Sequence, residues 1–314
     1  MQPISELAEA IRENDLCQWL LTEEPLAPRT TLRIGGKAAL LAIPKNAAAV
    51  ADLRALAAAF ELPSLLLGNG SNLLVSDEGF PGLVISLRET VTKVQCDGEC
   101  ITAGAGLSLS QLAAFARDQG LAGLEFAAGI PGTVGGGLYM NCGAYGGEMK
   151  DVVESSMVLE PEGGISVLRA GQHGFAYRHS ALMENGDIVL AATFRLQKDD
   201  PQAIGARMEE LARRRREKQP LHLPSAGSTF KRPAEGYAAQ MIDECGLKGL
   251  RVGGAVVSEK HAGFLCNDGG ATAADFLALM DQVQRRVQER FGVRLAPEVR
   301  YVGIETELSH VVYS

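Results

Sequence analysis

The sequence predicts an α+β fold in which two N-terminal modules are followed by a C-terminal domain. The chain has 314 residues, more than the roughly 250–300 at which a single core stops growing. A strand, helix, strand unit occupies 39–67, whereas strand patterns dominate from about residue 90. A charged helix, 202–218, then precedes a last region with its own long helix. The predicted boundaries are 1–25 for an N-terminal helix, 26–89 and 90–201 for the two modules, and 202–314 for the C-terminal domain.

The first module is predicted from helix, strand and linker signals in turn. Residues 4–21 fit an amphipathic helix, and the proline-containing PLAPRTT that follows predicts a linker. A short strand is expected at 39–43 and a buried one at 64–67. Between them Asn46 is a suitable N-cap for a helix. The apolar face of that helix consists of Val50, Leu53, Ala57 and Phe60.

The second module is predicted to contain strands around one well-bounded helix. The helix runs from Ser108 to Gln119, with Gly120 as its C-cap. The segments with strand patterns are 91–96, 100–106, 152–168 and 187–196.

The C-terminal domain ends in a long helix that begins at Thr272. Thr272 and Asp275 form a capping-box pattern, and the β-like segments 253–259 and 261–267 precede them. The apolar stripe of the helix, which we assign to core packing, consists of Phe276, Met280, Val283, Val287 and Phe291.

Charge and composition narrow the function classes. A net charge of −8 and a pI near 5.3 argue against a nucleic-acid binder, which usually has a basic face. No apolar run reaches the roughly 18 residues that a membrane span needs, so we expect a cytoplasmic protein. The histidines show no metal-ligand spacing, and neither do the cysteines, which we expect to be reduced structural thiols. The histidines are His173, His179, His222, His261 and His310.

One basic run, RRRREK at 213–218, stands out from this acidic background. Its simplest interpretation is a solvated helix face that Glu209, Glu210 and Glu217 partly balance. The alternative is that one of these cations reaches an anionic substrate.

Three glycine-dense segments suggest loops pressed against a ligand. They are LLLGNGSNLLV at 65–75, AGIPGTVGG at 128–136 and NCGAYGG at 141–147. Glycine allows close backbone approach, so successive N–H groups can converge on an anion such as a pyrophosphate. The first segment lacks the third glycine of a dinucleotide-binding fingerprint, and a β-like run follows it in place of a helix. Each segment alone is compatible with a tight turn.

The ordered set of motifs resembles the UDP-N-acetylenolpyruvoylglucosamine reductase family of flavoproteins. The resemblance extends from about residue 26 to 303 through TTLRIGGKA, LLGNGSNLLV, AGIPGTVGGGLYMNCGAYGGEM, YRHSAL, AGSTFKRP and APEVRYVG. It implies a two-module FAD-binding domain of vanillyl-alcohol-oxidase type plus a C-terminal α+β substrate-binding domain. One subclass has asparagine where Arg232 stands and an extra tyrosine-bearing loop, so this chain resembles the shorter, loop-less subclass.

The resemblance also implies the site residues. Non-covalent FAD is expected to contact three segments of the two modules. Arg178, Ser228 and Glu298 are the implied catalytic residues, and Tyr177, Lys231 and Arg232 are the implied substrate contacts. The implied FAD contacts are Ile34, Gly35, Gly36, Lys37, Gly68, Asn69, Gly70, Ser71, Asn72, Gly129, Ile130, Pro131, Gly132, Thr133 and Gly135.

The family reaction gives each catalytic residue a role. NADPH reduces FAD, and hydride then passes to C3 of the enolpyruvyl group of UDP-N-acetylglucosamine enolpyruvate. Arg178 would stabilise the resulting enediolate, and Ser228 would protonate C2 to give UDP-N-acetylmuramate, a peptidoglycan precursor. From charge logic, Glu298 is expected to be protonated when it acts, or to position a donor. Without the resemblance, the simpler interpretation of Ser228 is a helix or turn cap.

Two other functions remain open at this point. A flavin oxidase of the same architecture would share the glycine loops, but it would not need Arg178, Ser228 and Glu298 together. A flavin or sugar-nucleotide binding protein without turnover would need none of the three. We expect a monomer whose ligands are NADPH and the enolpyruvyl sugar nucleotide.

Overall fold

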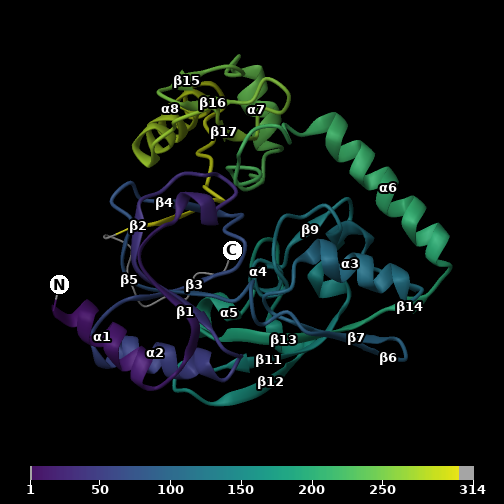
Figure 1. Ribbon diagram of the computed structural model, residues 1–314. Coiled ribbons are helices and arrows are strands. Elements are labelled where there is room, and N and C mark those ends of the chain that lie inside the picture. Colours follow the sequence, from purple (N-terminus) through teal and green to yellow (C-terminus); the bar gives the residue numbers. More distant parts are fainter. Residues whose placement is uncertain (1, 304–314) are drawn as a thin grey trace.

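The computed structural model describes residues 2–303 and divides them among three sheet-centred regions (Figure 1). The first region has a four-stranded sheet of order β1-β2-β5-β3, in which β1 pairs antiparallel with β2 while β2 and β3 run parallel to β5. Helices α1 and α2 pack together and against this sheet. The elements of this region are α1 (Gln2–Glu13), β1 (Cys17–Pro25), η1 (Ala27–Arg29), β2 (Lys37–Pro44), α2 (Ala49–Ala59), β3 (Ser64–Leu67), β4 (Leu73–Val75) and β5 (Phe80–Ser86).

The N-terminal helix is shorter than the sequence predicts. A helix over 4–21 is wrong beyond Glu13, because Cys17–Pro25 forms the edge strand β1. Asp15 adopts a left-handed φ of 53°, which ends the helix. Residues 17–25 then pair with Lys37–Pro44, a long-range contact that overrides their helix-like spacing. The helix predicted after Asn46 is confirmed as α2, but its N-cap is Ala48 and not Asn46. The Asn46 Oδ1 still accepts a hydrogen bond from the Ala49 N–H at 3.1 Å.

The second region contains a five-stranded antiparallel sheet of order β12-β11-β13-β7-β6. The predicted helix after Ser108 is confirmed as α3, with a capping box between Ser108 and Gln111. The glycine-rich helix α4 packs against strand β13. The elements are β6 (Val94–Asp97), β7 (Cys100–Gly104), α3 (Leu109–Asp118), β8 (Leu121–Ala122), η2 (Glu125–Ala127), α4 (Val134–Tyr139), β9 (Gly143–Ala144), β10 (Gly147–Glu148), η3 (Met149–Asp151), β11 (Val153–Leu159), β12 (Ile165–Arg169), η4 (Ala170–His173), α5 (Leu182–Asn185), β13 (Ile188–Arg195) and β14 (Gln197–Lys198).

The long helix α6 connects this region to a third one with its own core (Figure 1). In the third region α8 packs on the three-stranded sheet β15-β16-β17, and the predicted Thr272–Asp275 capping box is confirmed. The elements are α6 (Pro201–Lys218), α7 (Ala238–Glu244), β15 (Arg251–Val252), β16 (Ala255–Val257), β17 (Leu265–Asn267), α8 (Ala273–Phe291) and β18 (Arg300–Val302).

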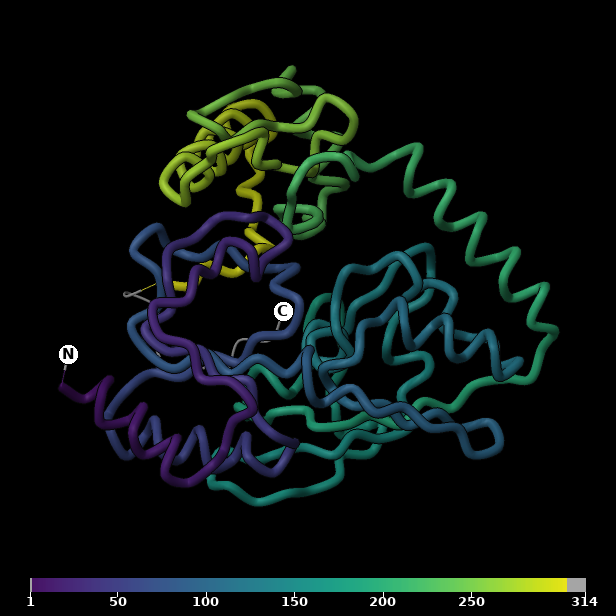
Figure 2. Tube along the Cα trace, viewed as in Figure 1, coloured from purple at the N-terminus to yellow at the C-terminus, as the bar shows by residue number. Residues whose placement is uncertain are grey.

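After α8 the chain returns to the first region, where β18 pairs in parallel with β4 (Figure 2). This return brings Glu298 next to the first glycine-rich loop, because the Asn72 amide donates a hydrogen bond to the Glu298 carbonyl oxygen at 3.1 Å. The six cysteines are free, as predicted. None of the helices within 2–303 is both long and apolar enough to cross a bilayer. His310 lies outside the described residues.

A substitution at Gly79 tests how closely the chain segments of the first region pack. Its φ is +82°, and a Cβ at this position would collide with the Lys37 carbonyl oxygen. We expect Gly79→Ala to lower the free energy of unfolding by about 2–4 kcal/mol, since it combines backbone strain with overpacking. Gly171→Ala is the matched control, because a Cβ there meets nothing within 4 Å. Equal denaturant midpoints for the two variants would contradict this packing.

Candidate active site

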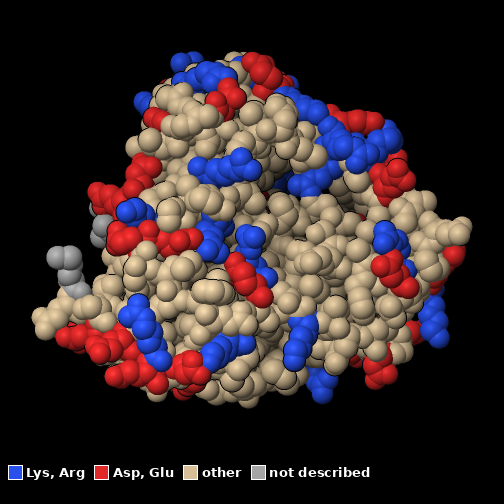
Figure 3. Space-filling model, viewed as in Figure 1, with Lys and Arg blue, Asp and Glu red and all other residues tan. Residues whose placement is uncertain are grey.

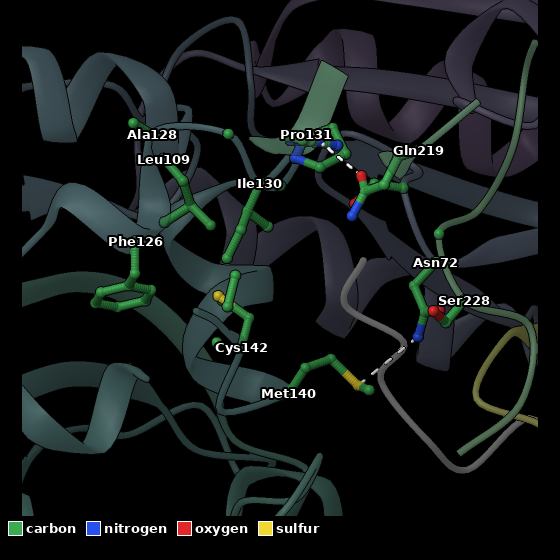
Figure 4. A pocket seen from close by; sticks show the side chains of 18 of the residues that line it. Asn72, Leu109, Phe126, Ala128, Ile130, Pro131, Met140, Cys142, Gln219 and Ser228 are labelled. Carbon is green, nitrogen blue, oxygen red and sulfur yellow. Dashed lines mark hydrogen bonds between the residues drawn. The ribbon is translucent and has the colours of Figure 1, made fainter. Parts of the chain in front are cut away.

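A cavity of about 280 Å³ lies where the three regions meet (Figure 4). In Figure 4 the side chains of Phe126, Leu109 and Ile130 gather on one side of it, and those of Asn72 and Ser228 lie on the other. Its remaining walls come from α6 and from the segments around Cys142 and Arg178. The lining residues are Ser71, Asn72, Leu109, Phe126, Ala128, Gly129, Ile130, Pro131, Gly132, Gly136, Gly137, Met140, Cys142, Gly143, Ala144, Tyr145, Arg178, Met208, Leu211, Ala212, Arg215, Gln219, Leu221, Ser225, Ala226, Gly227, Ser228, Phe264 and Glu298.

Two of the predicted glycine-rich loops are tied together at this cavity. The Asn69 amide donates a hydrogen bond to the Pro131 carbonyl oxygen at 2.6 Å. Gly70 follows with a φ of +60°, and a Cβ there would lie 2.5 Å from the Arg29 carbonyl oxygen, so only glycine fits this turn. The turn presents Ser71 and Asn72 to the cavity.

The structure places six of the implied FAD contacts on the cavity wall, and these are Ser71, Asn72, Gly129, Ile130, Pro131 and Gly132. Asn69 borders a second, adjoining cavity. Gly68, Gly70, Thr133 and Gly135 line neither cavity and support the loops from behind. Thr133, for example, is the N-cap of α4 and accepts a hydrogen bond from the Gly136 N–H at 3.4 Å.

The segment Ile34–Lys37 lies outside both cavities, and its implied contact with FAD stays a prediction. Ile34 is buried in the core of the third region, and Lys37 pairs with Glu23 on the exposed strand β1. The two glycines serve chain packing. The Gly36 N–H donates a hydrogen bond to the Ser76 carbonyl oxygen at 2.8 Å, and a Cβ on Gly35 would lie 2.6 Å from the Val75 Cβ.

The three implied catalytic residues share one cavity although the sequence separates them widely. The Arg178 Nε donates a hydrogen bond to the Glu298 Oε1 at 2.6 Å, with both side chains largely buried. Arg178 has a left-handed φ of 53°, a costly conformation for a residue with a side chain. Ser228 is exposed to the same cavity. A positive group, a buried carboxyl and a hydroxyl therefore converge on one volume.

Burial and the neighbouring charges shift the pKa values of both Glu298 and Arg178. It raises the pKa of the Glu298 carboxyl above its ordinary value, although the charges of Arg178 and Lys231 oppose this shift. For Arg178 burial would lower the pKa, but the Glu298 carboxylate more than offsets it, so the pKa of the guanidinium is raised. The arginine is thus a fixed cation, and the carboxyl takes up a proton more readily than an exposed glutamate.

The implied substrate contacts lie beside the cavity and do not line it. The Tyr177 hydroxyl accepts a hydrogen bond from the Arg232 N–H at 3.2 Å, and the Arg232 guanidinium stacks 4.1 Å from the centre of the Tyr237 ring. Lys231 is near enough to lower the pKa of Glu298. These residues therefore form a polar rim next to the Glu298 carboxyl.

Helix α6 contributes one wall of the cavity. Arg213 and Arg214 form ion pairs with Glu210 at 2.8 and 2.7 Å, so the solvated-face interpretation holds for them. Arg215 instead lines the cavity. The sequence contains a signal for this inward position, because Arg215 continues the helical spacing of Met208 and Leu211, which also line the cavity.

The cavity suits a flavin ring system. Its walls combine apolar side chains with bare glycine backbone, and such a slot accepts a flat aromatic ring. A Cβ at Gly132 would project among Leu109, Ile130 and Ser71, so the missing side chain keeps the wall open. Cys142 adds a small apolar surface, since burial raises the pKa of its thiol to about 12.

Comparison with known proteins supports this interpretation. Residues 38–171 match a family described as an FAD binding domain, and 219–302 match the C-terminal domain of UDP-N-acetylenolpyruvoylglucosamine reductase. The reductase of that name from Caldanaerobacter subterraneus subsp. tengcongensis is 46% identical over 96% of this chain and 98% of the relative. That of Limosilactobacillus fermentum is 49% identical over 89% of this chain and 93% of the relative.

A solved structure agrees in fold over nearly the whole chain. The crystal structure of a UDP-N-acetylenolpyruvylglucosamine reductase from Thermus caldophilus has a TM-score of 0.77 and 38% identity, covering 91% of this chain and 98% of that one. The predicted α+β class, with an FAD-binding domain followed by a C-terminal domain, is confirmed. The chain therefore belongs to the UDP-N-acetylenolpyruvoylglucosamine reductase family and is a flavin-dependent oxidoreductase.

Proposed function

We propose that the protein catalyses the NADPH-dependent reduction of UDP-N-acetylglucosamine enolpyruvate to UDP-N-acetylmuramate, with Ser228 as the proton donor. The observation that carries the proposal is the convergence of Arg178, Glu298 and Ser228 on the glycine-walled cavity. Family membership supports the same reaction in peptidoglycan precursor synthesis.

FAD is held, on this proposal, by the two tied loops and the apolar wall of the cavity. Ser71, Asn72 and the backbone of 129–132 would contact it, with Phe126 and Leu109 beside the ring. When bound, FAD supplies the hydride that it takes from the nicotinamide. Bound FAD and substrate would displace water from this largely apolar cavity, which would strengthen the charge interactions there.

Arg178 stabilises the charge that develops on the substrate. Hydride addition at C3 of an enolpyruvyl group places negative charge on C2 and the carboxylate, and a planar guanidinium offers two N–H groups to a carboxylate. The ion pair with Glu298 holds this guanidinium at the cavity before the substrate arrives. Such preorganisation costs no rearrangement when the charge appears.

Ser228 then protonates C2. A hydroxyl is a weak acid, but an enediolate carbon is a strong base, so a well-placed weak acid is sufficient. No histidine lines the cavity among the described residues, so a serine nucleophile with a histidine base is not supported. The Ser228 hydroxyl gives its proton to C2 and regains one afterwards from the polar groups around Glu298.

The raised pKa of Glu298 predicts a pH dependence. If the protonated carboxyl assists the second half-reaction, its rate is highest below the Glu298 pKa and declines as the pH rises through it. We expect Glu298→Gln, which cannot ionise, to flatten this limb of the profile while keeping a donor. Glu298→Ala, measured in parallel by stopped-flow absorbance, should be slower at every pH. An unchanged limb in Glu298→Gln would assign the titration to another group.

Steady-state turnover tests the proposed function against the oxidase alternative. The purified protein is loaded with FAD, and NADPH oxidation is followed with and without the enolpyruvyl sugar nucleotide under air. We expect oxidation to depend on that compound, and the product to be heavier by two hydrogen atoms in mass spectrometry. NADPH oxidation that needs only oxygen would favour an oxidase, and flavin binding without any turnover would favour a binding protein.

A further inference from the structure

The turn that carries Arg178 is short and strained. Ala176 and His179 pair across it through two backbone hydrogen bonds of 3.1 and 3.2 Å, so Tyr177 and Arg178 form its tip. Arg178 has a φ of 53°, and a residue with a side chain keeps such a left-handed conformation only where its surroundings enforce it. The contacts at the base of the turn therefore decide where the guanidinium lies.

Arg178 differs from the cations at the protein surface. In Figure 3 Lys and Arg side chains gather at the surface around a hollow beside α6, whereas the Arg178 side chain is only 25% exposed. Its Nε donates a hydrogen bond to the Glu298 Oε1 at 2.6 Å, and its Nη2 donates one to the Gly143 carbonyl oxygen at 3.5 Å. The second bond is long, so the ion pair and the turn itself supply most of the positioning.

Asn141 anchors one end of the turn. Its side chain is buried, and its Nδ2 donates hydrogen bonds to the Ala176 carbonyl oxygen at 3.0 Å and to the Glu148 Oε2 at 2.6 Å. Its Oδ1 accepts a hydrogen bond from the Lys150 N–H at 3.0 Å. Both amide donors and one acceptor site are thus used, so the amide cannot rotate without breaking a buried hydrogen bond.

Ser180 anchors the other end of the turn. Its hydroxyl is fully buried and donates a hydrogen bond to the Tyr139 carbonyl oxygen at 2.7 Å. Tyr139 is the last residue of α4 and Asn141 follows it closely, so both anchors attach the turn to the end of this helix. Because α4 packs against β13, the anchors fix the turn to the second region, whereas Glu298 comes from the chain that follows α8.

We propose that Asn141 and Ser180 are positioning residues that hold Arg178 for the reaction. Neither lines a cavity, so each acts through Arg178 and touches no ligand there. Loss of either anchor leaves a buried partner unpaired and allows the strained turn to relax. A misplacement of about 1 Å in such a group costs on the order of 10²-fold in rate. The inference rests on the proposed function, in which Arg178 stabilises the enediolate.

Asn141→Gly and Ser180→Ala each remove one anchor. Asn141 has a φ of 41°, which glycine adopts without strain, so Asn141→Gly deletes the amide and keeps the backbone conformation accessible. Thr193→Val is the control. The Thr193 Oγ1 lies 3.0 Å from the Thr102 Oγ1, so this variant also loses a side-chain hydrogen bond of the second region, but one that does not involve the turn.

Anaerobic stopped-flow absorbance compares the two half-reactions in these variants. We expect each anchor variant to slow the substrate-dependent half-reaction about ten- to a hundred-fold, with flavin reduction by NADPH near the parental rate. Both half-reactions should stay near the parental rates in Thr193→Val. Combined with Arg178→Gln, neither anchor variant should be slower than Arg178→Gln alone, because the anchors act through that guanidinium. Parental rates in both anchor variants, or fully additive slowing in the combinations, would overturn the proposal.

A measurement on the FAD-loaded protein without substrate separates this proposal from the proposed function. The Arg178 Nε–H signal in nuclear magnetic resonance, assigned by its loss in Arg178→Gln, reports the hydrogen bond to Glu298. We expect its exchange with solvent to be about ten-fold faster in both anchor variants than in Thr193→Val, which corresponds to one lost hydrogen bond. Equal exchange rates in the three variants would contradict the anchoring. Faster exchange in a protein that fails to reduce the enolpyruvyl compound would refute the proposed function and leave the anchoring of Arg178 standing.

Discussion

Ser228→Ala is expected to slow the substrate-dependent half-reaction by about 10²–10⁴-fold, the usual contribution of a general acid. The variant lacks only the hydroxyl that donates a proton to C2. Reduction of the bound flavin by NADPH needs no such proton and should remain nearly unchanged. Anaerobic stopped-flow absorbance measures the two half-reactions separately, so each variant serves as its own control for folding and flavin content.

Ser166→Ala is the matched control for this variant. Ser166 lies on strand β12 and lines neither cavity. Both half-reactions should stay near the parental rates in Ser166→Ala. If Ser228→Ala slowed both half-reactions to the same extent, the serine would position the flavin and would not be the proton donor.

Arg178→Gln is expected to slow the same half-reaction by about 10²–10³-fold, which is typical for the loss of one group that stabilises developing charge. The substitution also removes the partner of Glu298 at 2.6 Å. Without that cation the pKa of the buried carboxyl should rise further, since Arg178 now lowers it. The pH profile of the variant should therefore shift to higher pH.

Arg178→Lys separates charge from geometry. A lysine keeps the positive charge but not the planar pair of N–H donors, so an intermediate rate is expected. Both variants should reduce flavin with NADPH at nearly the parental rate. A parental rate for the second half-reaction in Arg178→Gln would remove Arg178 from the proposed mechanism.

Most helices and strands can be predicted from the sequence, because the residues that signal them, such as helix caps, are close together in the chain. The helices α3 and α8 have capping boxes that can be recognised from the residues alone. Strand β1 was not predicted, because residues 17–25 become a strand only by pairing with 37–44. Helical spacing and an exposed edge strand can look alike when a segment mixes apolar and charged residues.

In the candidate site, too, the sequence predicts some features, whereas others depend on contacts between distant parts of the chain. The resemblance brought Arg178, Ser228 and Glu298 together from distant motifs, whereas no pattern within the sequence places them on one cavity. The resemblance implies Gly35 and Gly36 as FAD contacts, and only the structure shows that both also lie where two chain segments approach too closely for a Cβ. Arg215 is the one of the four consecutive arginines 213–216 that faces the cavity, and this follows from how α6 packs against the second region.

An anaerobic two-step titration tests the central claim most directly. NADPH is added to the purified FAD-loaded protein, followed by the enolpyruvyl sugar nucleotide, while the visible absorption of the flavin is recorded. The proposal predicts bleaching by NADPH and full recovery with one equivalent of the second compound. A flavin that stays bleached until oxygen is admitted would contradict the proposed reaction and favour an oxidase.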